Sequence, residues 1–107
     1  MALGTITVGD DKLLKASAPA KVYQLSFAGD DAYVKGTGTA FQALVRAAVG
    51  ETVTVAAVVH GWATTPKYEL FYDDANDKLK ILDVNAGDEA ANGNYSTTTF
   101  YCTVIAI

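Results

Sequence analysis

The C-terminal segment STTTFYCTVIAI (residues 96–107) is the feature that most constrains how this chain can fold. Its β-branched and aromatic residues alternate as in a strand, and both faces of that strand are largely apolar. One face carries Phe100, Cys102, Val104 and Ala106, and the other carries Tyr101, Thr103, Ile105 and Ile107. Because an exposed edge strand of this kind invites aggregation, we expect the segment to be packed within a sheet or against a neighbouring molecule.

Strand patterns recur along the rest of the chain and are separated by turn signals. They cover residues 3–12, 21–31, 51–63, 68–74 and 78–84. In the valine-rich segment 51–63, alternation places the odd-numbered residues from Val53 to Val59 on one face. Gly61 is expected either to end this strand or to mark a bulge.

One convincing helix pattern occurs, in TAFQALVRAAVGE, whose apolar residues recur at helical spacing over about residues 40–49. Thr39 and Gln42 fit a capping box at its start, and Gly50 fits a left-handed cap at its end. About six strands and one short helix predict a single mainly β domain over residues 1–107. We expect a small β-sandwich or barrel.

The distribution of charge argues against two classes of partner. The net charge is −4, and residues 51–107 carry three basic and eight acidic side chains. Because the chain has no basic stripe to neutralise phosphates, we expect no nucleic-acid partner and no anionic membrane partner. We also expect no membrane span and no signal peptide, since the N-terminus lacks a basic start and Asp10 and Asp11 interrupt its apolar region.

The stretch KYELFYDDANDKLKILD (residues 67–83) raises the question of whether its acidic residues bind an ion. Calcium loops place ligands at alternating positions with a glycine and a distal glutamate, and neither is in register here. Asn and Asp are favoured in hairpin turns because they tolerate left-handed backbone angles. We therefore predict a β-hairpin that turns at residues 74–77, with an ion site as the weaker alternative; no metal or cofactor is predicted.

The chain offers few groups for catalysis. His60 is its only histidine and Cys102 its only cysteine, and no signature of nucleophilic catalysis surrounds either residue. We expect His60 to be a satisfied or half-exposed strand residue and Cys102 to be a buried, inert thiol. No catalytic residue is predicted. Trp62 has two open interpretations, an anchor for a partner or a lid on the core.

Several stretches, taken in order, resemble a family of small virion structural proteins of tailed bacteriophages. They are MALGTITVG, FAGDDAYVKGTGTAFQALVRAAVG, VTVAAVVHG, YELFYDDANDKLKILD and AGDEAANGNYSTTTFY. In the second stretch the resemblance rests on the spacing of Gly29, Asp30, Tyr33, Gly38, Phe41, Val45, Arg46 and Gly50. The chain departs from the family pattern at Val34–Lys35, where Pro-Gly is common, and at Tyr95, where Leu is common.

The resemblance implies a non-enzymatic capsid decoration (cement) protein, made in the host cytoplasm and located on the capsid surface of the virion. Its partners would be the major capsid protein and further copies of itself, in a homo-oligomer for which a trimer is favoured. The candidate interface residues are Leu3, Ile6, Val8, Trp62, Ile105 and Ile107.

The sequence allows two alternatives for the N-terminal segment and two for the function. Residues 1–20 either form an extended N-terminal arm that reaches a neighbouring subunit or pack within their own domain. The alternative function is a carbohydrate- or receptor-binding module of a phage head or tail fibre. In that function Trp62, Tyr33 and Tyr95, all expected in loops, would form an aromatic platform.

Overall fold

The computed structural model describes residues 3–8 and 21–107 of the chain. In chain order its elements are β1 (Thr7–Val8), β2 (Lys21–Ala28), β3 (Thr39–Ala40), α1 (Gln42–Val49), β4 (Val55–Ala63), β5 (Tyr68–Asp73), β6 (Lys78–Asp83), β7 (Asp88–Glu89) and β8 (Thr99–Ala106). The prediction of a mainly β fold with one short helix is confirmed. The two-residue strands β3 and β7 were not predicted, because they lie in segments whose glycines and polar residues are typical of loops.

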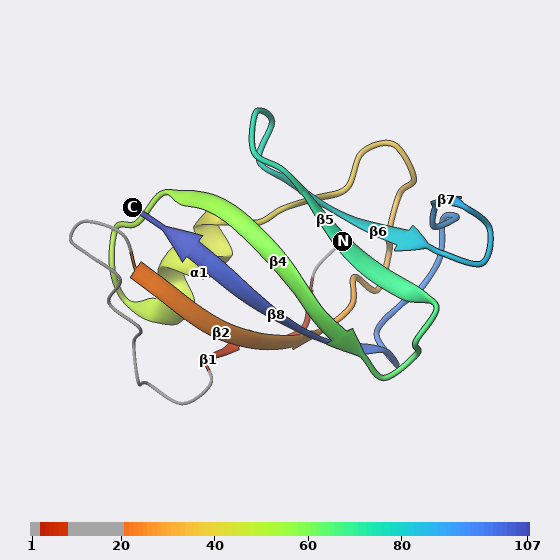
Figure 1. Cartoon of the computed structure of the whole chain (residues 1–107), viewed down its shortest axis with the longest axis horizontal. Helices are drawn as coiled ribbons and strands as arrows, with labels where there is room; N and C mark the ends of the chain where they lie inside the picture. Colours follow the sequence, from red (N-terminus) through yellow and green to blue (C-terminus); the bar gives the residue numbers. More distant parts are fainter. Residues whose placement is uncertain (1–2, 9–20) are drawn as a thin grey trace.

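The strands form two antiparallel sheets that build a small β-sandwich. The larger sheet has the order β1-β2-β8-β4, and the smaller has the order β3-β6-β5, with β7 paired to β6. In Figure 1 the larger sheet crosses the molecule and β5 and β6 lie to its upper right. Helix α1 lies behind the larger sheet, near the end of β8.

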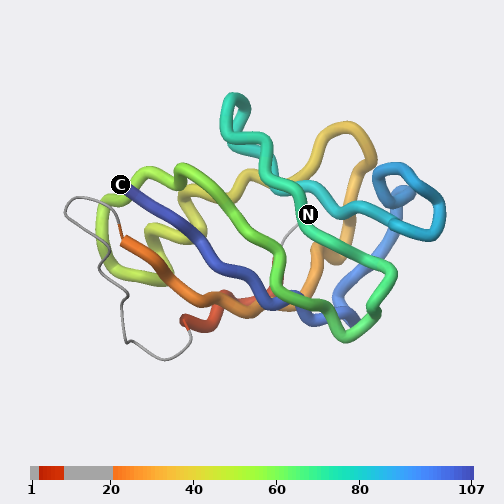
Figure 2. The backbone as a smooth tube through the Cα atoms, in the orientation of Figure 1, coloured from red at the N-terminus to blue at the C-terminus, as the bar shows by residue number. Residues whose placement is uncertain are grey.

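The C-terminal strand β8 occupies an interior position of the larger sheet. It pairs with β2 on one side and with β4 on the other, both antiparallel. The tube in Figure 2 shows β8 running between these two strands. The expectation that this strand is packed within a sheet is confirmed, and both of its edges are hydrogen-bonded.

One hydrophobic core lies between the two sheets and α1. Strand β8 alternates between half-buried and buried residues along its whole length, so Phe100 and Val104 are completely buried. Phe41 and Val45 bring α1 into the same core, and Leu79 brings in the smaller sheet. The Phe27 ring lies at a tilt against the rings of Phe41 and Phe100, an arrangement that adds about 0.5–1.5 kcal/mol per pair beyond area burial.

Strand β4 contains two bulges that change which face its residues occupy. The register shifts between Val55 and Ala57 and again between His60 and Trp62. The prediction that Val53 to Val59 share one face is therefore wrong: Val55 is buried, but Val59 is 53% exposed. An extra residue in one strand moves every following side chain to the opposite face.

Helix α1 begins two residues later than predicted, and its cap differs. Thr39 belongs to β3 and donates its hydroxyl to the Asp30 carboxylate (2.6 Å), so the capping box is wrong. The Asp77 carboxylate caps the helix instead, because it accepts from the backbone N–H of Gln42 (2.9 Å) and of Phe41 (3.3 Å). At the other end Gly50 adopts a φ of 73°, which confirms the left-handed cap.

The acidic stretch forms the predicted β-hairpin. Strands β5 and β6 pair in register from Tyr68–Asp83 to Asp73–Lys78. Asp77 closes the turn with a φ of 53°, a left-handed conformation that aspartate tolerates. Its carboxylate also accepts a hydrogen bond from the Tyr72 hydroxyl (2.7 Å), so this turn residue links the turn to β5.

Candidate functional site

The outer face of the larger sheet is built from three cross-strand rows of uncharged side chains. The rows, each read from β2 through β8 to β4, are Val22–Ile105–Ala57, Gln24–Thr103–Val59 and Ser26–Tyr101–Trp62. We call these residues the large-sheet face. These side chains point away from the core because the alternate residues of β2 and β8 point into it. Uncharged side chains can be buried against a partner without the cost of desolvating a charge.

The bulge at Gly61 turns Trp62 onto the large-sheet face. Without the extra residue, Trp62 would point to the same side as His60 and Cys102. A Cβ atom at position 61 would lie 2.8 Å from the Tyr101 carbonyl oxygen, so only glycine allows this close approach. The prediction that Trp62 lies in a loop is wrong, since it is part of β4. Of the two roles proposed for Gly61, the bulge is confirmed.

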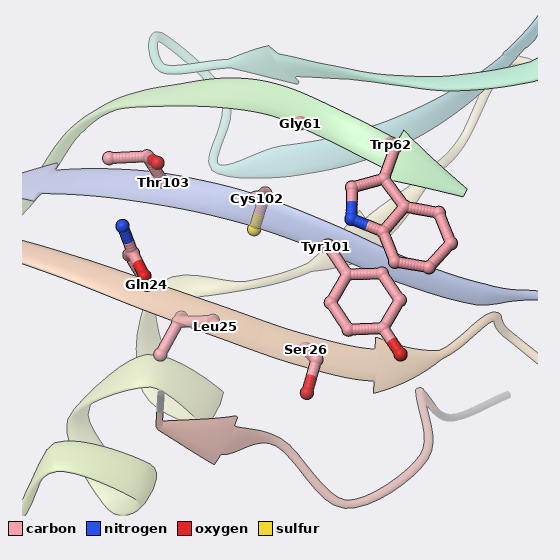
Figure 3. Close-up of a pocket in the computed structure, with 8 residues that line it drawn as sticks. All are labelled: Gln24, Leu25, Ser26, Gly61, Trp62, Tyr101, Cys102 and Thr103. Atoms are coloured by element: carbon pink, nitrogen blue, oxygen red, sulfur yellow. The ribbon is translucent and has the colours of Figure 1, made fainter. Parts of the chain in front are cut away.

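Trp62 stacks on its cross-strand neighbour Tyr101. The ring centroids are 4.1 Å apart and the planes differ by 8°, and Trp62 is still 56% exposed. The rings border a groove of about 330 Å³, and Gln24, Ser26 and Thr103 supply amide and hydroxyl groups to its lining (Figure 3). Ring faces, an amide and hydroxyls together provide groups for both van der Waals contact and hydrogen bonding.

The structure brings together two of the candidate interface residues and separates the others. Trp62 and Ile105 both lie on the large-sheet face. Ile107 follows β8, is 57% exposed, and exchanges two backbone hydrogen bonds with Thr54. Leu3, Ile6 and Val8 are partly buried against the core.

Residues 3–8 lie along β2, where β1 pairs with Ser26 and Leu25. The Gly4 N–H donates to the Ala28 carbonyl oxygen (2.9 Å). The rest of the predicted arm, residues 1–2 and 9–20, lies outside the described residues.

Sequence reasoning missed Val59 and Tyr101 as members of this face. For Tyr101 the sequence held a signal, because alternation places it on the same strand face as Ile105 and on the other face from Phe100. Val59 carried no such signal, since the first bulge in β4 decides its direction.

The aromatic platform that the alternative function requires does not form from the predicted residues. Tyr33 is only 2% exposed and its ring is packed in the core. Tyr95 is half-buried and meets Tyr33 and Tyr68 edge-on. Burial removes Tyr33 from any solvent-facing platform, so Trp62 has Tyr101 as its aromatic neighbour instead.

Cys102 lies on the inner side of β8, opposite the large-sheet face. It is 5% exposed, and burial raises the pKa of its thiol to about 12. The thiolate is the reactive form, so this cysteine is inert at neutral pH, as predicted. Over residues 3–8 and 21–107, no group of three or more His, Cys, Asp or Glu side chains is placed to hold a metal ion.

His60 links the two sheets through a neutral ring. Its Nδ1 accepts a hydrogen bond from the backbone N–H of Leu70 on β5 (3.3 Å). Burial lowers the pKa of His60 below its usual value of 6.5, and Glu69 offsets part of this effect. The unfolded chain therefore binds a proton more readily, and the free energy of unfolding should fall as the pH drops below about 6.5.

This prediction can be measured directly because the chain has a single histidine. An NMR titration of the ring should give a pKa below 6.5 in the folded protein and near 6.5 in concentrated urea. Substitution His60→Asn retains an acceptor for Leu70, and it should remove the extra loss of stability between about pH 6.5 and 5.5. A folded-state pKa at or above 6.5 would refute the prediction.

Helix α1 spans eight residues, and within the described part of the chain no helix has the length and apolar character to cross a membrane. Comparisons with protein-family models, with curated proteins and with solved structures find no match to this chain. A function must therefore be inferred from the sequence pattern and from the large-sheet face.

Proposed function

We propose that this chain is a non-enzymatic decoration protein of a tailed-phage capsid, and that its large-sheet face binds major capsid protein in the assembled shell. The single observation that carries the proposal is the composition of that face. It is uncharged, and it exposes Trp62 and Val59. The resemblance of the sequence to small virion structural proteins supports the same function.

The large-sheet face has the character of a protein-binding surface. Exposed apolar area framed by polar residues is typical of sites where another protein docks. A tryptophan that becomes buried in such a site commonly supplies much of the binding free energy. Here Trp62 is held in place by its stack on Tyr101, so little side-chain entropy is lost on binding.

Decoration of a capsid requires binding to the shell and no catalysis. A protein that binds only the assembled lattice shifts the equilibrium towards assembly by mass action. A homo-oligomer, with a trimer favoured, would contact several capsid subunits at once, and linked contacts raise the overall affinity without new interactions. The protein would be made in the host cytoplasm and would remain on the capsid surface of the virion.

A second candidate function, recognition of a neutral glycan on a phage head or tail fibre, is favoured by one observation. The stacked pair Trp62–Tyr101 stands beside the amide of Gln24 and the hydroxyls of Ser26 and Thr103. Aromatic faces combined with uncharged hydrogen-bonding groups suit a sugar ring.

The test is co-sedimentation of the purified protein with undecorated phage capsids. We expect saturable binding at a fixed number of copies per shell, and little binding to unassembled capsid protein. Failure to sediment with capsids would contradict decoration. A glycan array run in parallel separates the candidates, because selective glycan binding without capsid binding would favour the second function.

A further inference from the structure

The loop between β7 and β8 contains Asn92–Gly93, the one Asn–Gly pair in the sequence. In such a pair the backbone nitrogen of glycine can attack the side-chain carbonyl carbon of asparagine, because glycine has no side chain to obstruct the approach. The other asparagines precede bulkier residues: Asn76 precedes Asp, Asn85 precedes Ala and Asn94 precedes Tyr. Asn92 is therefore the position with the greatest intrinsic reactivity.

The fold holds both reacting groups of this pair. The Gly93 N–H donates to the Tyr33 carbonyl oxygen (3.2 Å), and the Tyr33 N–H donates back to the Gly93 carbonyl oxygen (2.8 Å). The two residues form an isolated antiparallel bridge. The side-chain oxygen of Asn92 accepts from the Lys35 N–H (2.7 Å). Nucleophile and electrophile are thus each bound to the segment 33–35.

That segment is itself anchored in the interior. The buried Tyr33 hydroxyl donates to the Glu89 carboxylate (2.5 Å) and accepts from the Ile81 N–H (2.9 Å). Glu89 also accepts from the Gly36 N–H (2.9 Å). The bridge at Gly93 is therefore connected to the core through Tyr33, and opening it requires more than the fraying of a surface loop.

We propose that Asn92–Gly93 is a site of spontaneous deamidation. The folded chain suppresses the reaction, and unfolding allows it. Once the bridge is broken, the Gly93 nitrogen bonds to Cγ of Asn92, the Cγ–Nδ2 bond breaks, and ammonia leaves with the proton that Gly93 loses. Water then opens the resulting succinimide at either carbonyl and yields aspartate or isoaspartate at position 92.

The isoaspartate product makes unfolding harder to reverse. Either product adds a negative charge at position 92, which Asp88 and Glu89 precede in the chain. Isoaspartate also lengthens the backbone by one carbon, so the bridge to Tyr33 and the contact with Lys35 cannot both re-form in the same geometry. The modification would mark molecules that have unfolded, and it is independent of the proposed function.

The test compares the conversion of Asn92 in the folded protein and in the same chain in concentrated urea. Both samples are kept at the same mildly alkaline pH and the same temperature. Peptide mapping by mass spectrometry follows conversion at Asn92, with Asn85 and Asn94 as internal references. We expect conversion at Asn92 to be about tenfold slower or more in the folded protein, because only the opened population reacts. Equal rates in the two states, or no conversion at Asn92 in urea, would overturn the proposal.

Two variants sharpen the comparison. Gly93→Ala keeps the N–H, and its new Cβ would make ordinary contact with the Tyr95 ring (3.7 Å), so the fold should be retained. Its methyl group should suppress most of the conversion in urea. Glu89→Ala removes one of the two hydrogen bonds of the Tyr33 hydroxyl and should accelerate conversion in native buffer. If this variant stays folded, confirmed by circular dichroism, and reacts no faster, the anchoring role of Glu89 is refuted.

Discussion

Replacing Trp62 with alanine is expected to weaken binding to capsids by about 30-fold or more. The expected loss follows from the role of Trp62 as an anchor of the contact, since truncation of an anchor residue costs about 2 kcal/mol or more of binding free energy. The side chain is 56% exposed on an uncharged face and is fixed by its stack on Tyr101, so much ring surface is available to a partner. Quantitative co-sedimentation with undecorated capsids measures the loss.

A matched control separates this role from a general effect of losing an exposed aromatic ring. Phe71 on β5 is 50% exposed and belongs to the other sheet. Phe71→Ala should leave capsid binding unchanged within about twofold. Trp62→Ala also loses the stack with Tyr101, worth about 0.5–1.5 kcal/mol, so thermal unfolding must confirm that the variant remains folded. Equal losses in the two variants would argue against the large-sheet face.

Asp30→Ala is expected to lower the free energy of unfolding by about 2–4 kcal/mol, the largest effect on folding among these predictions. Asp30 is completely buried, and its carboxylate accepts from the Thr39 hydroxyl (2.6 Å) and from the Ala32 N–H (2.8 Å). Alanine would leave the buried Thr39 hydroxyl without this partner, and an unsatisfied buried polar group costs about 1–3 kcal/mol. Urea denaturation followed by circular dichroism measures the change.

Two further aspartate variants test the cause. Asp30→Asn keeps an acceptor oxygen of similar shape and should cost less than Asp30→Ala. Asp74 is an exposed residue of the β5–β6 turn, and Asp74→Ala should change the stability by no more than about 0.5 kcal/mol. If Asp30→Ala proves as mild as Asp74→Ala, the buried hydrogen bonds of Asp30 contribute little to the fold.

Local sequence chemistry predicts the elements of this fold well. Alternation identifies β8 and its two faces, because side chains in a regular strand must point to opposite sides. The turn residues at 74–77 predict the hairpin, and Gly50 predicts the end of α1. Each of these features depends on residues that are close together in the chain.

Features that depend on distant residues were not predictable in the same way. Asp77 caps α1 from a hairpin that lies many residues further along the chain, so no local sequence pattern predicts this cap. The bulges of β4 exist only relative to the register of β8. These bulges place Val59 and Trp62 on the large-sheet face, so the candidate site could be predicted only in part from the sequence.

The most direct test of the account is a reconstruction, by electron cryomicroscopy, of capsids saturated with this protein. We predict that the large-sheet face lies against major capsid protein and that the Trp62 ring is buried in the contact. A map in which Trp62, Val59 and Ile105 point to solvent while another surface holds the shell would contradict it.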